Sequence, residues 1–188
     1  MRDIFRDNRR LLVFIILSNF LLNFGFQVWQ TLFNNFAVEN IGAGPAQIGL
    51  IQAVREVPGL LGFAIAFLAL FMSEIRLMTV SVILLGIGVA ATGYANSVTT
   101  LLMTTFVMSL GFHFFMPSSN SVILMLMKQE DTPRTLGNLG SLGSLASVAG
   151  TGAVLLLAGA LGYKSMFISV GVLVIVAGLL LLPFGNRP

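Results

Sequence analysis

Cysteine is absent from this 188-residue chain, and only 9% of its residues are charged. The lack of cysteine excludes disulfide bonds, thiolate metal sites and thiol catalysis. Soluble globular domains carry about a quarter of their residues as Asp, Glu, Lys and Arg, so the low charge argues against a soluble enzyme or transcription factor. The ten basic residues form no continuous basic stripe, so nucleic acid is not an expected partner.

Residue patterns typical of membrane-embedded enzymes and channels are also missing. The stretch Gly140-Ser141-Leu142-Gly143 has the wrong spacing for an intramembrane serine protease and follows the only histidine, His113. The chain has no paired-histidine zinc motif and no phosphate-binding loop. It also has no carbonyl filter sequence and no arginine-repeat helix. We therefore predict that the protein is not an enzyme and uses no cofactor and no metal.

Long apolar runs fill almost the whole sequence, which has 56% hydrophobic residues and a mean hydropathy of +0.96. A helix that crosses the hydrocarbon core of about 30 Å needs about 20 mostly apolar residues. Runs of sufficient length cover approximately residues 11–38, 45–72, 75–95, 98–127, 134–161 and 165–184. We predict an all-α integral membrane protein, a single domain of six transmembrane helices over residues 1–188.

The distribution of basic residues predicts the orientation of these helices. With the amino terminus in the cytoplasm, eight basic residues are cytoplasmic: Arg2, Arg6, Arg9, Arg10, Arg76, Lys128, Arg134 and Arg187. Lys164 alone would be outside. This bias follows the positive-inside rule. We expect a multi-pass protein of the plasma or inner membrane with both termini in the cytoplasm.

A weak internal repeat connects the two halves of the chain. Residues 45–51 resemble residues 133–139, and residues 76–78 resemble residues 164–166, both at a shift of 88 positions. Three helices separate the copies, so the second copy enters the membrane from the opposite side, which predicts a 3+3 inverted repeat. The predicted units are repeat one at about 11–95, repeat two at about 98–184 and a cytoplasmic loop at about 128–135.

The first predicted helix carries five amide side chains on one face. Their spacing of three or four residues keeps them within a narrow arc of an α-helix. They are Asn19, Asn23, Gln27, Gln30 and Asn34. The stripe predicts either a water-accessible lining or hydrogen bonds between helices, and the number of amides in register favours the lining.

The fourth predicted helix has a similar polar face, which contains Ser109, His113 and Asn120. Small residues dominate the fifth segment, 134–161, and are typical of close helix packing. The third and sixth segments carry no amide in their apolar stretches, so we expect them to contact lipid all round.

The second predicted helix contains adjacent charges, Arg55 and Glu56, close to its middle. Charges inside the membrane are costly, so they usually have a function. Adjacent helical residues point about 100° apart, so we expect each side chain to reach groups on other helices. Gln52 extends the same polar flank, and Pro58 predicts a kink that could act as a hinge.

Together, the orientation, the inverted repeat, the polar first and fourth helices and the small-residue fifth segment resemble the amino-terminal six-helix half of a major facilitator superfamily transporter. The resemblance implies that helices one, two, four and five line a central cavity. It also places the loop motif between helices two and three on residues 73–76, where Glu74 stands for the usual Asp and Arg76 is the basic residue. Gly150-Thr151 stands where the antiporter motif has Gly-Pro.

The resulting prediction is a secondary transporter that moves a small polar or amphipathic solute by alternating access. Members of the family have two six-helix halves, so a second half is expected, either as a second copy, as a separate chain or as the rest of a longer chain. H⁺ or another coupling ion is left open. A membrane scaffold or assembly factor that keeps the fold is the alternative.

Overall fold

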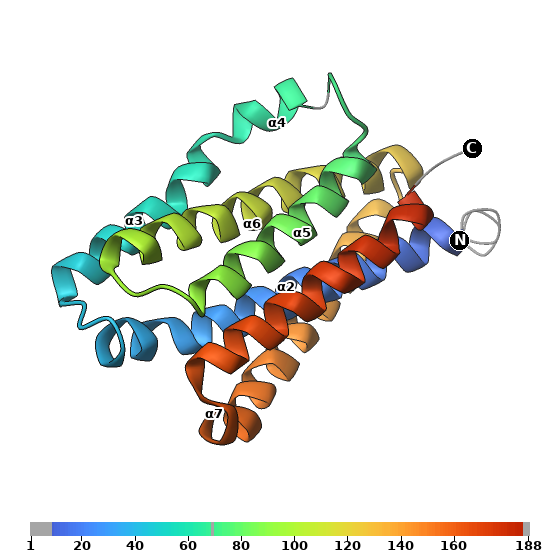
Figure 1. Cartoon of the computed structure of the whole chain (residues 1–188). Helices are drawn as coiled ribbons and strands as arrows, with labels where there is room; N and C mark the ends of the chain where they lie inside the picture. Colours follow the sequence, from blue (N-terminus) through green and yellow to red (C-terminus); the bar gives the residue numbers. More distant parts are fainter. Residues whose placement is uncertain (1–8, 69, 186–188) are drawn as a thin grey trace.

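The computed structural model describes residues 9–68 and 70–185, and every regular element in these ranges is helical. The elements are α2 (Arg9–Glu39), α3 (Pro45–Leu60), α4 (Gly62–Leu68), α5 (Glu74–Thr92), α6 (Val98–Leu126) and α7 (Thr132–Gly185). They run roughly along one direction as a bundle, and α4 lies at its edge (Figure 1). The all-α prediction is confirmed for the described residues.

Local sequence signals determine where the helices begin. Pro45 starts α3, where a missing N–H costs nothing, and the Gln47 side chain accepts a hydrogen bond from the Gly44 N–H at 2.9 Å. The Ser97 hydroxyl accepts a hydrogen bond from the Thr100 N–H at 3.2 Å and caps α6. Each cap satisfies a backbone donor that has no partner within its helix.

Four helices are long and apolar enough to cross a membrane: α2, α5, α6 and α7. The longest, α7, is interrupted at Gly162, which has φ 72° and ψ 168°. Only glycine adopts such an angle without strain, so the chain reverses there. The first arm of α7 (132–161) and the second arm (163–185) lie on either side of this turn, in orange and red in Figure 1.

The predicted second span, 45–72, is not one continuous helix. It is divided into α3 and α4 at Leu61, whose N–H donates to the Val57 carbonyl at 3.2 Å. Pro58 is buried inside α3 and lacks an N–H for the carbonyl one turn earlier, which weakens the helix shortly before the break. The six transmembrane helices and the 3+3 repeat stay predictions.

The prediction that the third segment contacts lipid all round is wrong. This segment forms α5. In its most apolar stretch of 18 residues 61% is buried, a larger share than in any other candidate span. It packs against α6 and α7 through glycines: a Cβ on Gly86 would lie 2.9 Å from the Gly171 carbonyl oxygen, and one on Gly111 would meet the Ser81 carbonyl oxygen. Without side chains at these positions the helix backbones approach closely.

A buried tryptophan connects α2 to α5. The Trp29 indole N–H donates to the Thr92 hydroxyl at 3.2 Å, and that hydroxyl donates to the Gly88 carbonyl at 2.8 Å. The centroids of the Phe33 and Trp29 rings lie 4.5 Å apart. This contact aligns α2, which carries the amide stripe, with α5, the most buried span.

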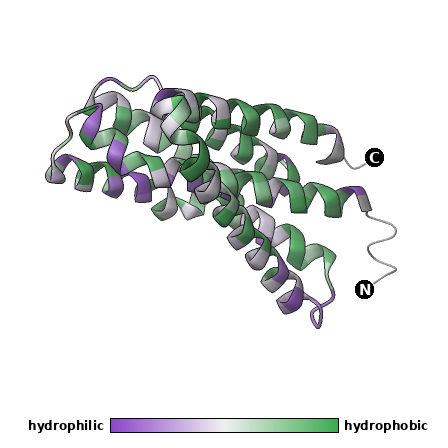
Figure 2. Ribbon diagram, turned by 90° about the horizontal axis from the view of Figure 1, so that it is seen from below, coloured by the Kyte–Doolittle hydropathy of each residue, from purple (hydrophilic) through white to green (hydrophobic). Residues whose placement is uncertain are grey.

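Most residues of the helices are hydrophobic, whereas many of the hydrophilic residues lie near turns and helix ends (Figure 2). The start of α2 and the end of α7 lie at the same end of the bundle (Figure 1). The basic residues Arg2, Arg6 and Arg187 of the predicted cytoplasmic set lie outside the described residues. The orientation in the membrane stays a prediction.

Candidate functional site

The charged residues of α3 form an ion pair with each other. The Arg55 guanidinium donates two hydrogen bonds to Glu56 Oε1, from Nη2 at 2.7 Å and from Nε at 3.0 Å. The Arg55 side chain is 21% exposed and the Glu56 side chain is 54% exposed. The pair therefore lies on a face of α3 that the described helices cover only in part.

This pairing corrects the prediction that both charges reach other helices separately. The flexible arginine side chain turns back along its own helix, so a direction of about 100° between adjacent Cβ atoms does not prevent contact. Glu56 also faces another helix, because its Oε2 atom lies 3.6 Å from His113 Nε2 on α6. One carboxylate thus lies between a guanidinium and an imidazole.

Close packing of α3 on α6 places His113 beside this pair. A Cβ on Gly59 would lie 2.9 Å from His113 Cε1, so the absence of a side chain at Gly59 makes room for the imidazole ring. One turn earlier on α6, the Ser109 hydroxyl donates to the Arg55 carbonyl. Ser109 and His113 of the fourth segment are therefore brought together with Arg55 and Glu56 of the second.

The amide stripe of α2 makes its hydrogen bonds within its own helix. Asn23 Nδ2 donates to the Asn19 carbonyl at 2.8 Å, and Gln27 Nε2 donates to the Thr31 hydroxyl at 3.2 Å. Asn19 is buried, whereas Gln30 and Asn34 are exposed. No hydrogen bond from the stripe to another helix occurs among the described residues, so the interhelical alternative has no support there.

Small residues on the first arm of α7 fit against this stripe. A Cβ on Gly143 would lie 3.1 Å from Asn23 Nδ2, and one on Gly150 would lie 3.2 Å from the Gln27 Cβ. The two glycines are seven residues apart, or two helical turns, and therefore share a face. The small residues permit a close approach between the arm and the amides.

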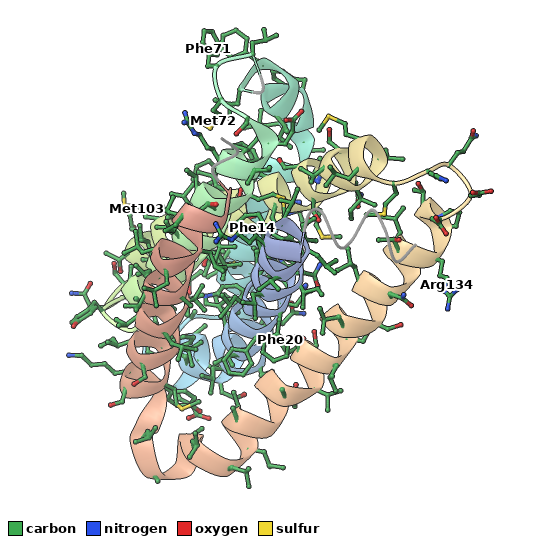
Figure 3. All side chains as sticks on the ribbon, turned by 90° about the vertical axis from the view of Figure 1, so that its right-hand side faces the viewer. Phe14, Phe20, Phe71, Met72, Met103 and Arg134 are labelled. Carbon is green, nitrogen blue, oxygen red and sulfur yellow. The ribbon has the colours of Figure 1, made fainter. Side chains whose placement is uncertain are left out.

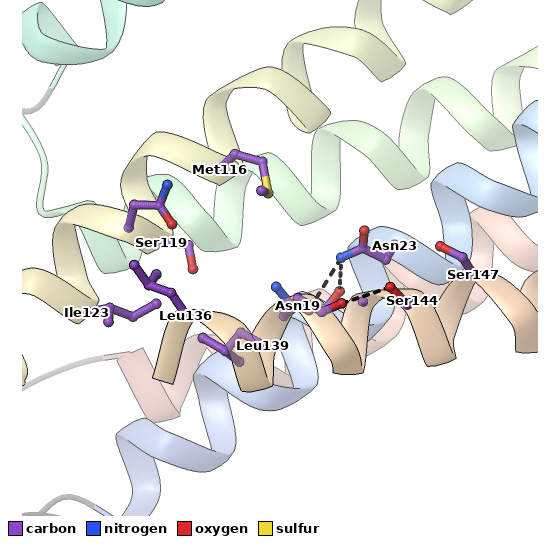
Figure 4. A pocket seen from close by; sticks show the side chains of 12 residues that line it. Asn19, Asn23, Met116, Ser119, Ile123, Leu136, Leu139, Ser144 and Ser147 are labelled. Carbon is purple, nitrogen blue, oxygen red and sulfur yellow. Dashed lines mark hydrogen bonds between the residues drawn. The ribbon is translucent and has the colours of Figure 1, made fainter. Parts of the chain in front are cut away.

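A hollow of about 390 Å³ lies between α2, α6 and the first arm of α7 (Figure 4). Its polar wall combines predicted residues with serines: Asn19, Asn23, Asn120, Ser119, Ser144 and Ser147. The serines of α7 were predicted to serve helix packing. Small residues at regular spacing are compatible both with close packing and with the lining of a polar hollow. The hydroxyls of Ser144 and Ser147 are three residues apart among glycines, and this spacing could have indicated a polar lining.

The remaining predicted residues are distributed over α3 and α5. Gln52 is half-buried on α3. Glu74 and Arg76 lie in the first turn of α5, where Glu74 complements the positive end of the helix dipole and the Arg76 N–H donates to the Ser73 hydroxyl at 3.4 Å. Ser73 thus caps α5, and the predicted gating roles of Pro58, Glu74 and Arg76 stay predictions.

Sequence reasoning missed a contact at the opposite end of the bundle. The Tyr163 hydroxyl donates to Glu39 Oε2 at 2.8 Å and connects the end of α2 to the turn of α7. The Phe36 and Tyr163 rings lie 6.0 Å apart in the same region. Lys164, the next residue, lies 4.9 Å from the centroid of the Tyr94 ring. No local periodicity reveals such contacts, because their members are more than 60 residues apart.

The four long apolar helices are typical of a multi-pass membrane protein. A sequence profile described as Major Facilitator Superfamily matches residues 5–188. The chain belongs to this family, whose members are transporters and not enzymes. A search among curated proteins finds no match.

Proposed function

We propose that this chain is one six-helix half of a transporter that moves a small polar or amphipathic solute by alternating access. The path would lie along α2, α3, α6 and the first arm of α7. The observation that carries the proposal is the Arg55–Glu56 pair on a partly exposed face of α3, since charges within an apolar segment are costly unless they face water or protein.

Two further observations support this path. The hollow between α2, α6 and α7 is lined by amides and hydroxyls, which suit a polar solute. The α5 helix, by contrast, is buried against α6 and α7 and offers no comparable polar surface. Helices α2 and α6 would then line the path while α5 supports them from behind.

A second six-helix half would cover the partly exposed face of α3 that carries the Arg55–Glu56 pair. The region around α4 exposes large apolar side chains: Leu60, Phe63, Phe67, Leu70 and Phe71. Figure 3 shows Phe71 at an outer edge of the molecule. Two halves related by an axis along the membrane normal would enclose the Arg55–Glu56 pair between them.

We propose that the cytoplasmic side is the end with Arg76, Lys128 and Arg134, in accordance with the positive-inside rule.

The proposal predicts which thiols water can reach. The chain has no cysteine, so single cysteines can be placed without a background. Ser147→Cys lines the hollow, whereas Leu145→Cys, two positions away and 60% exposed, lies on another face of the same arm. Maleimides react with the thiolate, which forms in water and not in hydrocarbon. In native membranes we expect Ser147→Cys to react at least about tenfold faster than Leu145→Cys.

Equal rates would contradict the proposed path, because both positions would then have the same surroundings. Labelling of Ser147→Cys in membranes, together with flux of no tested solute in reconstituted vesicles, would favour the scaffold function instead.

A further inference from the structure

The carboxylate of Glu56 is shared between two groups that bind anions or protons. Its Oε1 atom accepts both hydrogen bonds from Arg55, and its Oε2 atom lies 3.6 Å from His113 Nε2. The side chains of Arg55 and His113 are 21% and 23% exposed, so both can be approached from the proposed path. A guanidinium, a carboxylate and an imidazole therefore meet on one face.

These three groups are the only charged or titratable side chains on α3, α4 and α6 within the described residues. With a neutral imidazole, the site has a net charge of zero. A net charge within the membrane is unfavourable even beside a water-lined path, because the surrounding apolar helices and lipid weaken the screening. Any anion that enters this site therefore favours uptake of a compensating positive charge.

We propose that the site binds a small carboxylate anion on Arg55 together with one proton on His113. This inference rests on the proposed transport function and names its substrate class and coupling ion. The planar guanidinium presents two parallel N–H donors that match a carboxylate, which a point charge such as lysine does not. The incoming carboxylate replaces Glu56 on this fork.

Glu56 then turns toward His113, and the imidazole takes one proton from water. The protonated ring donates its Nε2–H to Glu56 Oε2. Apart from this new N–H bond on His113, which a proton from the aqueous solution supplies, no covalent bond in the protein changes. The site starts with Arg⁺ and Glu⁻, ends with Arg⁺, Glu⁻, His⁺ and the bound anion, and is neutral in both states. Charge balance alone thus couples the anion to the proton.

The exposure of Glu56 explains why a substrate can displace it. A partly exposed ion pair contributes little net stability, because water solvates both partners when they separate. Glu56 is 54% exposed, so its bond to Arg55 is replaceable rather than permanent. A fully buried pair would compete too strongly with the substrate.

Calorimetry on the 188-residue chain in lipid nanodiscs tests this proposal, with acetate, lactate and benzoate as probes. Titrations at pH 7.5 in two buffers of different ionisation enthalpy report the protons taken up per anion. We expect at least one probe to bind with about one proton per anion. Arg55→Gln should weaken its affinity about 10- to 100-fold, because charge-assisted hydrogen bonds are lost. The matched control Arg134→Gln should bind as the unaltered chain does.

Glu56→Gln separates the proposal from a simple anion site. This variant removes the competing carboxylate, so the anion should bind at least as tightly, and without proton uptake because Arg55 and the anion are already neutral together. Absence of binding by all three probes, binding without a proton, or unchanged proton uptake in Glu56→Gln would each overturn the inference. Thiol labelling of Ser147→Cys requires no ligand, so it tests the transport path independently.

Discussion

Gly111→Val is expected to destabilise the fold by about 3 kcal/mol, the upper end of the usual cost of overpacking. A Cβ at Gly111 meets the Ser81 carbonyl oxygen and the Leu85 backbone nitrogen of α5. Backbone atoms inside a helix cannot rotate away, so α5 and α6 must separate. The measurement is the midpoint of thermal unfolding in detergent, where a loss of this size corresponds to roughly 6–12 °C.

Gly137→Val is the matched control for this experiment. It makes the same substitution in a helix, but nothing lies within 4 Å of the position of the added Cβ. Its midpoint should therefore change only slightly. Equal shifts for the two variants would contradict the close contact between α5 and α6.

Trp29→Ala should destabilise the protein by about 3 kcal/mol or more, as expected for truncation of a fully buried tryptophan. The side chain has no exposed surface, and its indole N–H donates to Thr92. Truncation opens a cavity between α2 and α5 and removes the hydrogen bond as well. Chemical or thermal unfolding in detergent measures the loss.

Trp29→Phe separates these two effects. It keeps most of the ring and removes the N–H donor, so the expected loss is about 1 kcal/mol. If Trp29→Ala were no less stable than Trp29→Phe, the ring would not contribute to the packing of α2 on α5. Both variants keep the amide stripe, so a change in unfolding reports on the supporting contact.

Local patterns predicted the polar faces of single helices well. The spacing of Asn19, Asn23 and Gln27 defines a stripe because residues three and four apart share a helical face. The structure brings two of these amides into one hollow with Asn120 of α6. The charged pair and His113 were predicted on separate helices, and the structure places His113 beside Glu56.

Burial of α5 could not be predicted from its composition. Lipid and protein neighbours are equally apolar, so an apolar helix has no hydrophobic preference that separates its two surroundings. The informative residues were Gly86 and Gly88, which allow close approach to Gly171 and Met108. Small residues within an apolar segment therefore indicated its packing more reliably than its hydropathy did.

The pairing of Arg55 with Glu56 was missed for a different reason. Backbone geometry determines where a side chain starts, but a long arginine can reach a neighbour in sequence by choice of rotamer. The break of the second span at Leu61 could not be predicted from Pro58 alone. A proline indicates that the helix is weakened nearby, but it does not determine the residue at which the helix ends.

Access of water to α3 from both sides of the membrane tests the central claim most directly. Gln52→Cys lies one turn before Glu56 on the same flank, and Leu145→Cys serves as the control. Both variants are treated with an impermeant maleimide in sealed native vesicles of each orientation. Since the reaction is irreversible, even a minor conformation accumulates label. Alternating access predicts labelling of Gln52→Cys from either side and little labelling of Leu145→Cys; labelling from one side only, or from neither, would contradict it.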